Sequence, residues 1–204
     1  MRKRREWDRR PAFASFPTIF VLAVSLIAAA APAASQVVTL QADPQHTSVN
    51  FTLKDVLHTV RGTFRAERGS LQFDPGTNKI SGEVVVNAKS GESGSTMRDR
   101  KMHREVLESD RYPEIVFRPD RVDGAVKTQG KSSVQVHGIF VLHGNEREMT
   151  VPAEVEMSAD HWSAILHFEL PYGNWGIKNP STLFLKVGDT VQIDIDATGS
   201  VVQH

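Results

Sequence analysis

The chain has 204 residues, of which 40% are hydrophobic, with 24 Lys and Arg, 24 Asp and Glu, and no cysteine. A chain of this length suits one domain or at most two small ones. The lack of cysteine excludes disulfide bonds and thiol chemistry, so the fold must be stabilised by a hydrophobic core.

The first residues are typical of a secretory signal peptide. Six of the first ten residues are Lys or Arg, residues 19–31 carry no charge, and small residues at positions 31–35 fit a cleavage site. We predict that residues 1–35 are removed on export and that residues 36–204 form one domain, periplasmic or secreted from a bacterium. The alternative is a membrane anchor. Because the apolar segment at residues 19–31 has only 13 residues and a transmembrane helix needs about 20, we expect no transmembrane anchor after processing.

Removal of this leader changes the charge balance. Residues 36–204 contain 18 Lys and Arg and 22 Asp and Glu, a net charge of −4. A surface of this sign argues against nucleic acid or an anionic membrane as the main partner.

The mature part has apolar residues at every second position over much of its length. Such alternation places one face of a strand against an apolar interior and the other face in water. The alternating segments are residues 48–53, 60–66, 71–73, 134–142, 149–157, 162–170 and 191–197, and turn sequences such as residues 74–78, 123–124 and 144–145 separate them. The pattern predicts an antiparallel sheet of roughly eight to ten strands, closed into a barrel or sandwich.

One segment, residues 95–109, lacks this alternation. Thr96 is a candidate helix cap with Asp99 three residues later, and Met102 and Val106 would share one face of a helix. We predict a short helix that covers a mouth or an edge of the sheet.

Polar residues that could carry chemistry are few. His137 and His143 would lie about 20 Å apart on one strand, and the sequence has no HxH or HExxH motif, so we expect no metal. Asp99 and His103 could hydrogen-bond at helical spacing, but no nucleophile is evident beside them. We predict no catalytic residue and keep an enzyme acting on an amphipathic substrate as an alternative.

Large apolar residues occur on many of the predicted strands. Those in phase with their strands should point to one interior, namely Phe51, Phe64, Phe117, Phe140 and Phe168. A filled core would explain each of them, yet a barrel of about eight strands can also hold one small ligand. Met97 and Met102 would then form an adaptable apolar lid.

Six stretches of sequence, in order along the chain, match the motifs of one family. They are residues 43–51, residues 58–64 with 69–75, Arg98-Asp99-Arg100-Lys101-Met102, Tyr112-Pro113-Glu114-Ile115-Val116-Phe117, residues 136–144, and Trp175-Gly176-Ile177-Lys178. Through these stretches the chain, from about residue 41 to 199, resembles the YceI-like, polyisoprenoid-binding proteins.

This resemblance implies both a fold and a ligand. The fold is all-β with one short helix, a lipocalin-like, extended antiparallel β-barrel. An apolar tunnel would hold an isoprenoid or a similar amphipathic lipid, without a cofactor. The chain departs from the family pattern at Lys101, where the family has histidine, so Arg98 or Lys101 would contact the head group instead.

We therefore predict an exported binding protein, not an enzyme, that sequesters or carries such a lipid. The residues predicted to line the tunnel are Phe51, Leu53, Phe64, Val84, Val86, Met97, Arg98, Met102, Leu107, Phe117, Phe140, Leu142, Leu166, Phe168 and Trp175. A ligand-free, stress-related interaction module with a solid core is the remaining alternative, and the choice between monomer and homodimer stays open.

Overall fold

The computed structural model describes residues 37–54, 59–181 and 187–203. The predicted signal peptide lies outside these residues, so it and the domain boundary at residue 36 stay predictions. The described part contains nine strands: β1 (Val38–Ala42), β2 (Ser48–Lys54), β3 (Thr59–Asp74), β4 (Lys79–Glu92), β5 (Glu114–Asp123), β6 (Gly130–Leu142), β7 (Asn145–Met157), β8 (His161–Leu170) and β9 (Val191–Gln203). It also contains the helical segments η1 (Pro44–His46), α1 (Thr96–Lys101), η2 (Met102–Val106) and η3 (Tyr172–Trp175).

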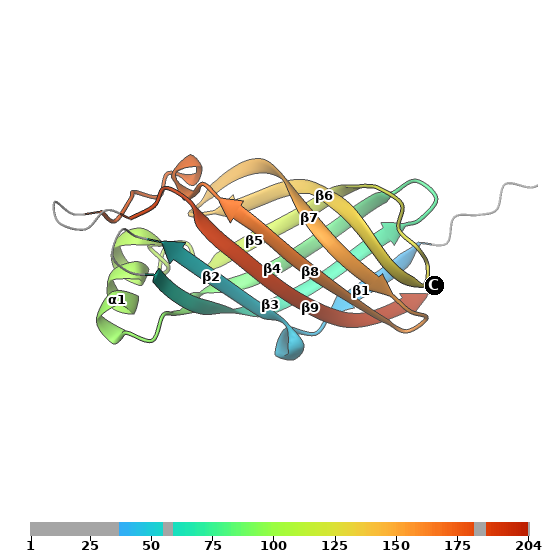
Figure 1. Ribbon diagram of the computed structural model, residues 1–204, viewed down its shortest axis with the longest axis horizontal. Coiled ribbons are helices and arrows are strands. Elements are labelled where there is room, and N and C mark those ends of the chain that lie inside the picture. Colours follow the sequence, from blue (N-terminus) through green and yellow to red (C-terminus); the bar gives the residue numbers. More distant parts are fainter. Residues whose placement is uncertain (1–36, 55–58, 182–186, 204) are drawn as a thin grey trace, which may run out of the picture. The chain divides into compact units, whose positions relative to one another are not determined.

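The strands form one antiparallel ring (Figure 1). Each strand from β2 to β8 pairs with the next one along the chain, and β9 returns to pair with β2. A closed ring leaves no open sheet edge, so the backbone groups of neighbouring strands satisfy one another. The predicted all-β fold with one short helix, an antiparallel barrel, is therefore confirmed.

Strands β1 and β2 share one position in the ring, and the sequence around Asp43 separates them. Both strands pair with β3 on one side and with β9 on the other. Between them, Asp43 accepts a hydrogen bond from the Gln45 backbone N–H at 2.9 Å, and Pro44 starts the η1 turn. His46 donates to the Asp43 carboxylate at 2.7 Å, and this hydrogen bond lowers the pKa of that carboxyl. The motif that resembles the family thus has a structural role here.

Two packed clusters lie inside the ring, one toward each end. The distal cluster contains Leu40, Phe73, Ile80, Val122, Val134, Ala153, Met157, Trp162 and Ala164. The lid-end cluster contains Leu142, Leu170, Tyr172, Trp175 and Ile177, at the end of the ring where α1 lies (Figure 1). The five phenylalanines predicted to point inward are all buried or half-buried, and this confirms the predicted phase of the strands.

Strands β7 and β8 separate toward the lid end. Their ladder ends with Ala153 opposite Leu166. The next residue of β7 is Pro152, which has no N–H to donate to a neighbouring strand. Beyond this point η3 is tied to β7, because Arg147 Nε donates to the Asn174 carbonyl at 3.1 Å. The wider end of the ring therefore accommodates η3.

The segment predicted to be a short helix, which we call the lid segment (residues 95–109), is helical but differs from the prediction in detail. Ser95 and not Thr96 precedes the first helical residue, and Asp99 accepts a hydrogen bond from the Ser93 N–H at 2.8 Å instead of closing a capping box. After Lys101 the helix widens to a π-helix in η2. The segment lies across one end of the ring, as predicted (Figure 1). Within the described residues, no helix is long and apolar enough to cross a membrane.

Candidate functional site

The candidate site is the stretch of barrel interior between the two clusters. Seven of its inward side chains belong to neither cluster and are only half-buried, whereas Val49 and Phe51 beside them and the residues of the clusters are buried. We call this set the half-buried belt: Val60, Phe64, Ala66, Val84, Val86, Phe117 and Ile195. Since these side chains face inward, their accessible surface lies inside the ring. A folded protein normally covers such apolar surface, so the belt is the part of the interior that a ligand could cover.

Aromatic rings line the interior from the belt toward the lid end. The rings of Phe51 and Phe64 are 5.4 Å apart, and those of Phe117 and Phe140 are 6.4 Å apart. Phe140 also meets Trp175 edge-on at 5.6 Å, and Trp175 Nε1 donates to the Phe140 carbonyl at 3.0 Å. Because its N–H is satisfied and its ring is buried, Trp175 is a fixed wall of the site.

Gly91 is the point at which the lid segment meets the belt. A Cβ atom at Gly91 would lie 2.5 Å from the Phe64 ring and 2.9 Å from Met102 Cε, so any larger residue would displace one of them. His103 fastens the lid segment to the same residue, since its Nε2 donates to the Gly91 carbonyl at 2.8 Å. Its Nδ1 lies 3.0 Å from the hydroxyl of the buried Ser109. A carbonyl can only accept, so the Nε2 atom of His103 carries a proton.

Most residues predicted to line the tunnel face the interior, at different levels of the barrel. Phe64, Val84, Val86 and Phe117 belong to the half-buried belt. Leu53, Leu107, Phe140, Leu142, Phe168 and Trp175 pack at the lid-end cluster, Leu166 packs against the distal cluster, Phe51 covers Gly62, and Met102 lies over Gly91. Their contact with a ligand stays a prediction.

Two of the predicted tunnel residues, Met97 and Arg98, do not face the interior. Met97 is 83% exposed, because it lies about 140° around the helix from Met102, which faces the belt. Arg98 is exposed and donates to both the hydroxyl and the carbonyl of Ser93, each at 2.7 Å. Arg98 therefore braces the loop before α1, and Lys101 is exposed on the outer side of α1. The prediction that either residue contacts a head group has no support in this geometry.

The alternative pairing of Asp99 with His103 is not formed. The Asp99 carboxylate accepts hydrogen bonds from the N–H and hydroxyl of Ser93, whereas His103 bonds Gly91 and Ser109. In the described part of the chain, no group of three or more His, Asp or Glu residues is arranged to hold a metal ion. His137 and His143, the two histidines weighed as metal ligands, each have one carboxylate neighbour, Asp120 and Glu108. The same holds for His161 with Asp160 and His167 with Asp194.

Sequence reasoning missed a group of residues that anchors the end of the lid segment. The rings of Tyr112 and His143 are 4.6 Å apart, and His143 Nε2 donates to Glu108 at 3.3 Å. Gly144 has a φ of 71°, and a Cβ atom there would lie 2.5 Å from the Tyr112 ring. These contacts join the lid segment to β5 and to the β6–β7 turn. The motifs at residues 112–117 and 136–144 contained the signal, but only the fold brings them together.

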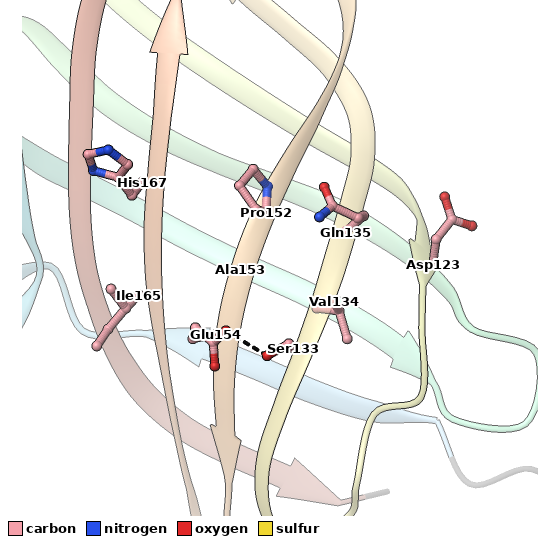
Figure 2. Close-up of a pocket in the computed structure, with 9 residues that line it drawn as sticks. All are labelled: Asp123, Ser133, Val134, Gln135, Pro152, Ala153, Glu154, Ile165 and His167. Carbon is pink, nitrogen blue, oxygen red and sulfur yellow. Dashed lines mark hydrogen bonds between the residues drawn. The ribbon is translucent and has the colours of Figure 1, made fainter.

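Two depressions open on the surface of the described part. One has a volume of about 290 Å³ and is lined by residues of β5 to β8, among them Glu154, Ile165 and His167 (Figure 2). The other, of about 900 Å³, is lined by β2, β3 and residues 92–99, and its polar residues include Arg61 and Glu92. Most of the side chains that line them are on the outward phase of their strands. Neither depression therefore coincides with the half-buried belt.

The fold and the site together define a class, an antiparallel β-barrel with an apolar interior and a helical lid. The chain belongs to the YceI-like domain family, whose model matches residues 40–199. It is similar to a UPF0312 protein of Pseudomonas syringae pv. tomato, 27% identical over 170 residues that cover 78% of this chain and 82% of the relative. A UPF0312 protein of Pseudomonas savastanoi pv. phaseolicola is 26% identical over 165 residues, 76% of this chain and 81% of the relative.

Solved structures share the fold. BcnA of Burkholderia cenocepacia superposes with a TM-score of 0.65 at 18% identity, over 78% of this chain and 99% of that one. A polyisoprenoid binding domain from Saccharophagus degradans superposes with a TM-score of 0.64 at 16% identity, over 80% and 98% of the two chains. The predicted family is thus confirmed, and the likeness to these two structures concerns the fold alone.

Proposed function

We propose that this protein is an exported bacterial binding protein that sequesters or carries an isoprenoid or similar long-chain amphipathic lipid inside the barrel. The observation that carries the proposal is the half-buried belt, a set of inward apolar side chains that are only half-buried between two packed clusters. The polyisoprenoid binding domain from Saccharophagus degradans, which has the same fold, supports this class of ligand.

The energetics of burial favour a long apolar chain. Each CH₂ group transferred from water contributes about 0.8 kcal/mol. A chain of roughly 30 to 40 carbons could thus supply more free energy than any observed affinity requires. Tight binding therefore needs no polar recognition, which is consistent with an interior site whose belt is entirely apolar.

The direct test places a charge in the belt and compares it with the same charge on the outer wall. The first variant is Phe117→Asp, in which the replaced side chain faces the interior. The second is Ile165→Asp, in which the replaced side chain faces outward and is 59% exposed. A carboxylate in a lipid-filled cavity loses its hydration, but water can solvate it when the barrel is empty. We expect Phe117→Asp to lose retention of a fluorescent isoprenoid alcohol while it stays folded, with a melting temperature lower by no more than about 8 °C, and Ile165→Asp to change neither.

The same experiment separates the alternatives. If wild-type protein retains no isoprenoid and Phe117→Asp unfolds, the interior is solid and the protein is an interaction module. Native mass spectrometry of protein purified from its own host would identify the bound lipid, and a chemically altered lipid would indicate an enzyme.

Export has its own test. N-terminal sequencing of the exported protein should begin near residue 36. An intact Met1 in the membrane fraction would instead indicate an anchor.

A further inference from the structure

The outward face of the lid segment has an unusual composition. Met97, Arg100, Lys101 and Arg104 are all exposed. They are spaced by three, four and seven residues from Met97, so they lie on one side of the helix. The inward side, with Val106 among its residues, packs against the lid-end cluster. The lid segment is therefore amphipathic, with one long apolar side chain among cations on its outer face.

The cations of this face differ from the other charged groups around them. Asp110 pairs with Lys89 at 2.9 Å, and Glu108 has both Arg111 and His143 as neighbours. Among the residues that the structure describes, by contrast, Arg100, Lys101 and Arg104 have no carboxylate partner. Between residues 96 and 106 the acidic residues are the exposed Glu105 and Asp99, which accepts from Ser93, against the four cations Arg98, Arg100, Lys101 and Arg104. The outer face of the lid segment thus has a local positive charge that its own chain does not neutralise.

We infer that this face docks on the surface of an anionic phospholipid bilayer, with Met97 inserted at the boundary between head groups and acyl chains. Cations on an amphipathic helix are attracted to anionic lipids, and a long apolar side chain adds burial. Residues 36–204 have a net charge of −4, so the rest of the surface is repelled and the lid end is turned toward the membrane. The inference rests on the proposed function, since docking at this end would bring the interior next to a source of lipid.

The test is flotation with vesicles of phosphatidylcholine containing about 30% phosphatidylglycerol, and with vesicles of phosphatidylcholine alone. Each cation near an anionic surface strengthens partitioning by about fivefold, so Arg100→Gln with Lys101→Gln and Arg104→Gln should weaken it by roughly a hundredfold. Met97→Ala should weaken it by a few fold. Salt at about 0.5 M should remove most of the binding.

The matched control removes three cations from the opposite end of the barrel. Lys79→Gln, Lys127→Gln and Lys131→Gln replace exposed residues and change the net charge by the same amount. We expect this variant to float like wild type. Equal losses in the two triple variants, or equal binding to both kinds of vesicle, would overturn the inference, as would no binding by wild type.

A separate measurement distinguishes this inference from the proposed function. Retention of a fluorescent isoprenoid alcohol is measured in solution without vesicles, where the lid-segment variant should match wild type. If wild type floats but retains no isoprenoid, docking stands and the proposed ligand is wrong. If it retains isoprenoid but does not float, the ligand site stands and the docking surface is wrong.

Discussion

The two ends of the barrel are built differently. At the distal end, short turns join β3 to β4 and β7 to β8, and the cluster inside is almost inaccessible. In the β3–β4 turn, Asp74 accepts hydrogen bonds from the Gly76 N–H at 2.9 Å and the Thr77 hydroxyl at 2.7 Å. Asn78 extends this network, since its side chain donates to the Gly124 carbonyl at 3.0 Å. Backbone pairing and side-chain packing here serve stability.

At the lid end, regular pairing gives way to irregular segments. Strands β7 and β8 part beside Pro152, and the lid segment changes from α-helix to π-helix after Lys101. Side-chain contacts of residues such as His103 and Tyr112 hold these segments in place. At the distal end, strand pairing does so instead. Such regions open at lower free energy than a strand ladder. The difference indicates that the distal end secures the fold and that the lid end is the less stable of the two.

The largest expected effect comes from truncating a phenylalanine in each region. Phe73→Ala, in the distal cluster where Phe73 is 3% exposed, should lower the free energy of unfolding by about 3–5 kcal/mol. Phe117→Ala should cost only about 1–2 kcal/mol, because Phe117 is half-buried and its side chain therefore buries less apolar surface. Urea denaturation measures both. Equal costs would mean that the belt is packed core and that the comparison is wrong.

A smaller and more local effect is expected for His103→Ala. This change removes the hydrogen bonds to Gly91 and Ser109 and should destabilise the lid segment by about 1–2 kcal/mol. Amide hydrogen exchange should rise in residues 96–106 but stay unchanged in the distal strands. His161→Ala, at an exposed distal position, is the control. Increased exchange throughout the barrel would show that the two ends are not independent.

The smallest effect concerns Tyr172 in the lid-end cluster. Its hydroxyl donates to the Gly188 carbonyl at 2.6 Å, and burial, with a contribution from Asp189, raises its pKa. A pKa raised in the folded state stabilises the protein below the unfolded value of about 10, and this contribution is lost as the pH rises through the folded pKa.

Tyr172→Phe should therefore lower the free energy of unfolding by about 1 kcal/mol at pH 7. The difference in free energy of unfolding between this variant and wild type should shrink above about pH 10. Urea unfolding at both pH values measures this. Tyr112→Phe is the control, because the Tyr112 hydroxyl has no hydrogen-bond partner among the described residues. If the difference in free energy of unfolding between the variant and wild type stays constant across the pH range, burial in the lid-end cluster does not raise the pKa of Tyr172.

Much of the fold was predictable because strand periodicity is a local property. The alternation around Phe51, Phe140 and Phe168 predicted which side chains face the interior, and the structure agrees. The antiparallel barrel followed from the same alternation together with the turn sequences. The split between β7 and β8 beside Pro152 was not predicted, although a proline in a strand contains that signal.

The predictions for the lid segment were less accurate, because helical spacing does not say which face meets the barrel. Met102 faces the belt as predicted, whereas Met97 and Arg98 do not. Thr96 was predicted to cap the helix with Asp99, but the Asp99 carboxylate instead accepts a hydrogen bond from the Ser93 N–H. Contacts between segments decided these positions.

The sequence by itself determined the class of fold and the inward phase of the strands, because a period of two assigns each side chain to one face of a sheet. It also contained the family motifs at residues 43–51 and 112–117. Only the tertiary structure decided where the interior is packed and where it is half-buried. Val84 and Phe117 are as apolar and as regularly spaced as the residues of the distal cluster. Their partial exposure depends on how the strands close around them, because the room inside a barrel is set by all its strands together.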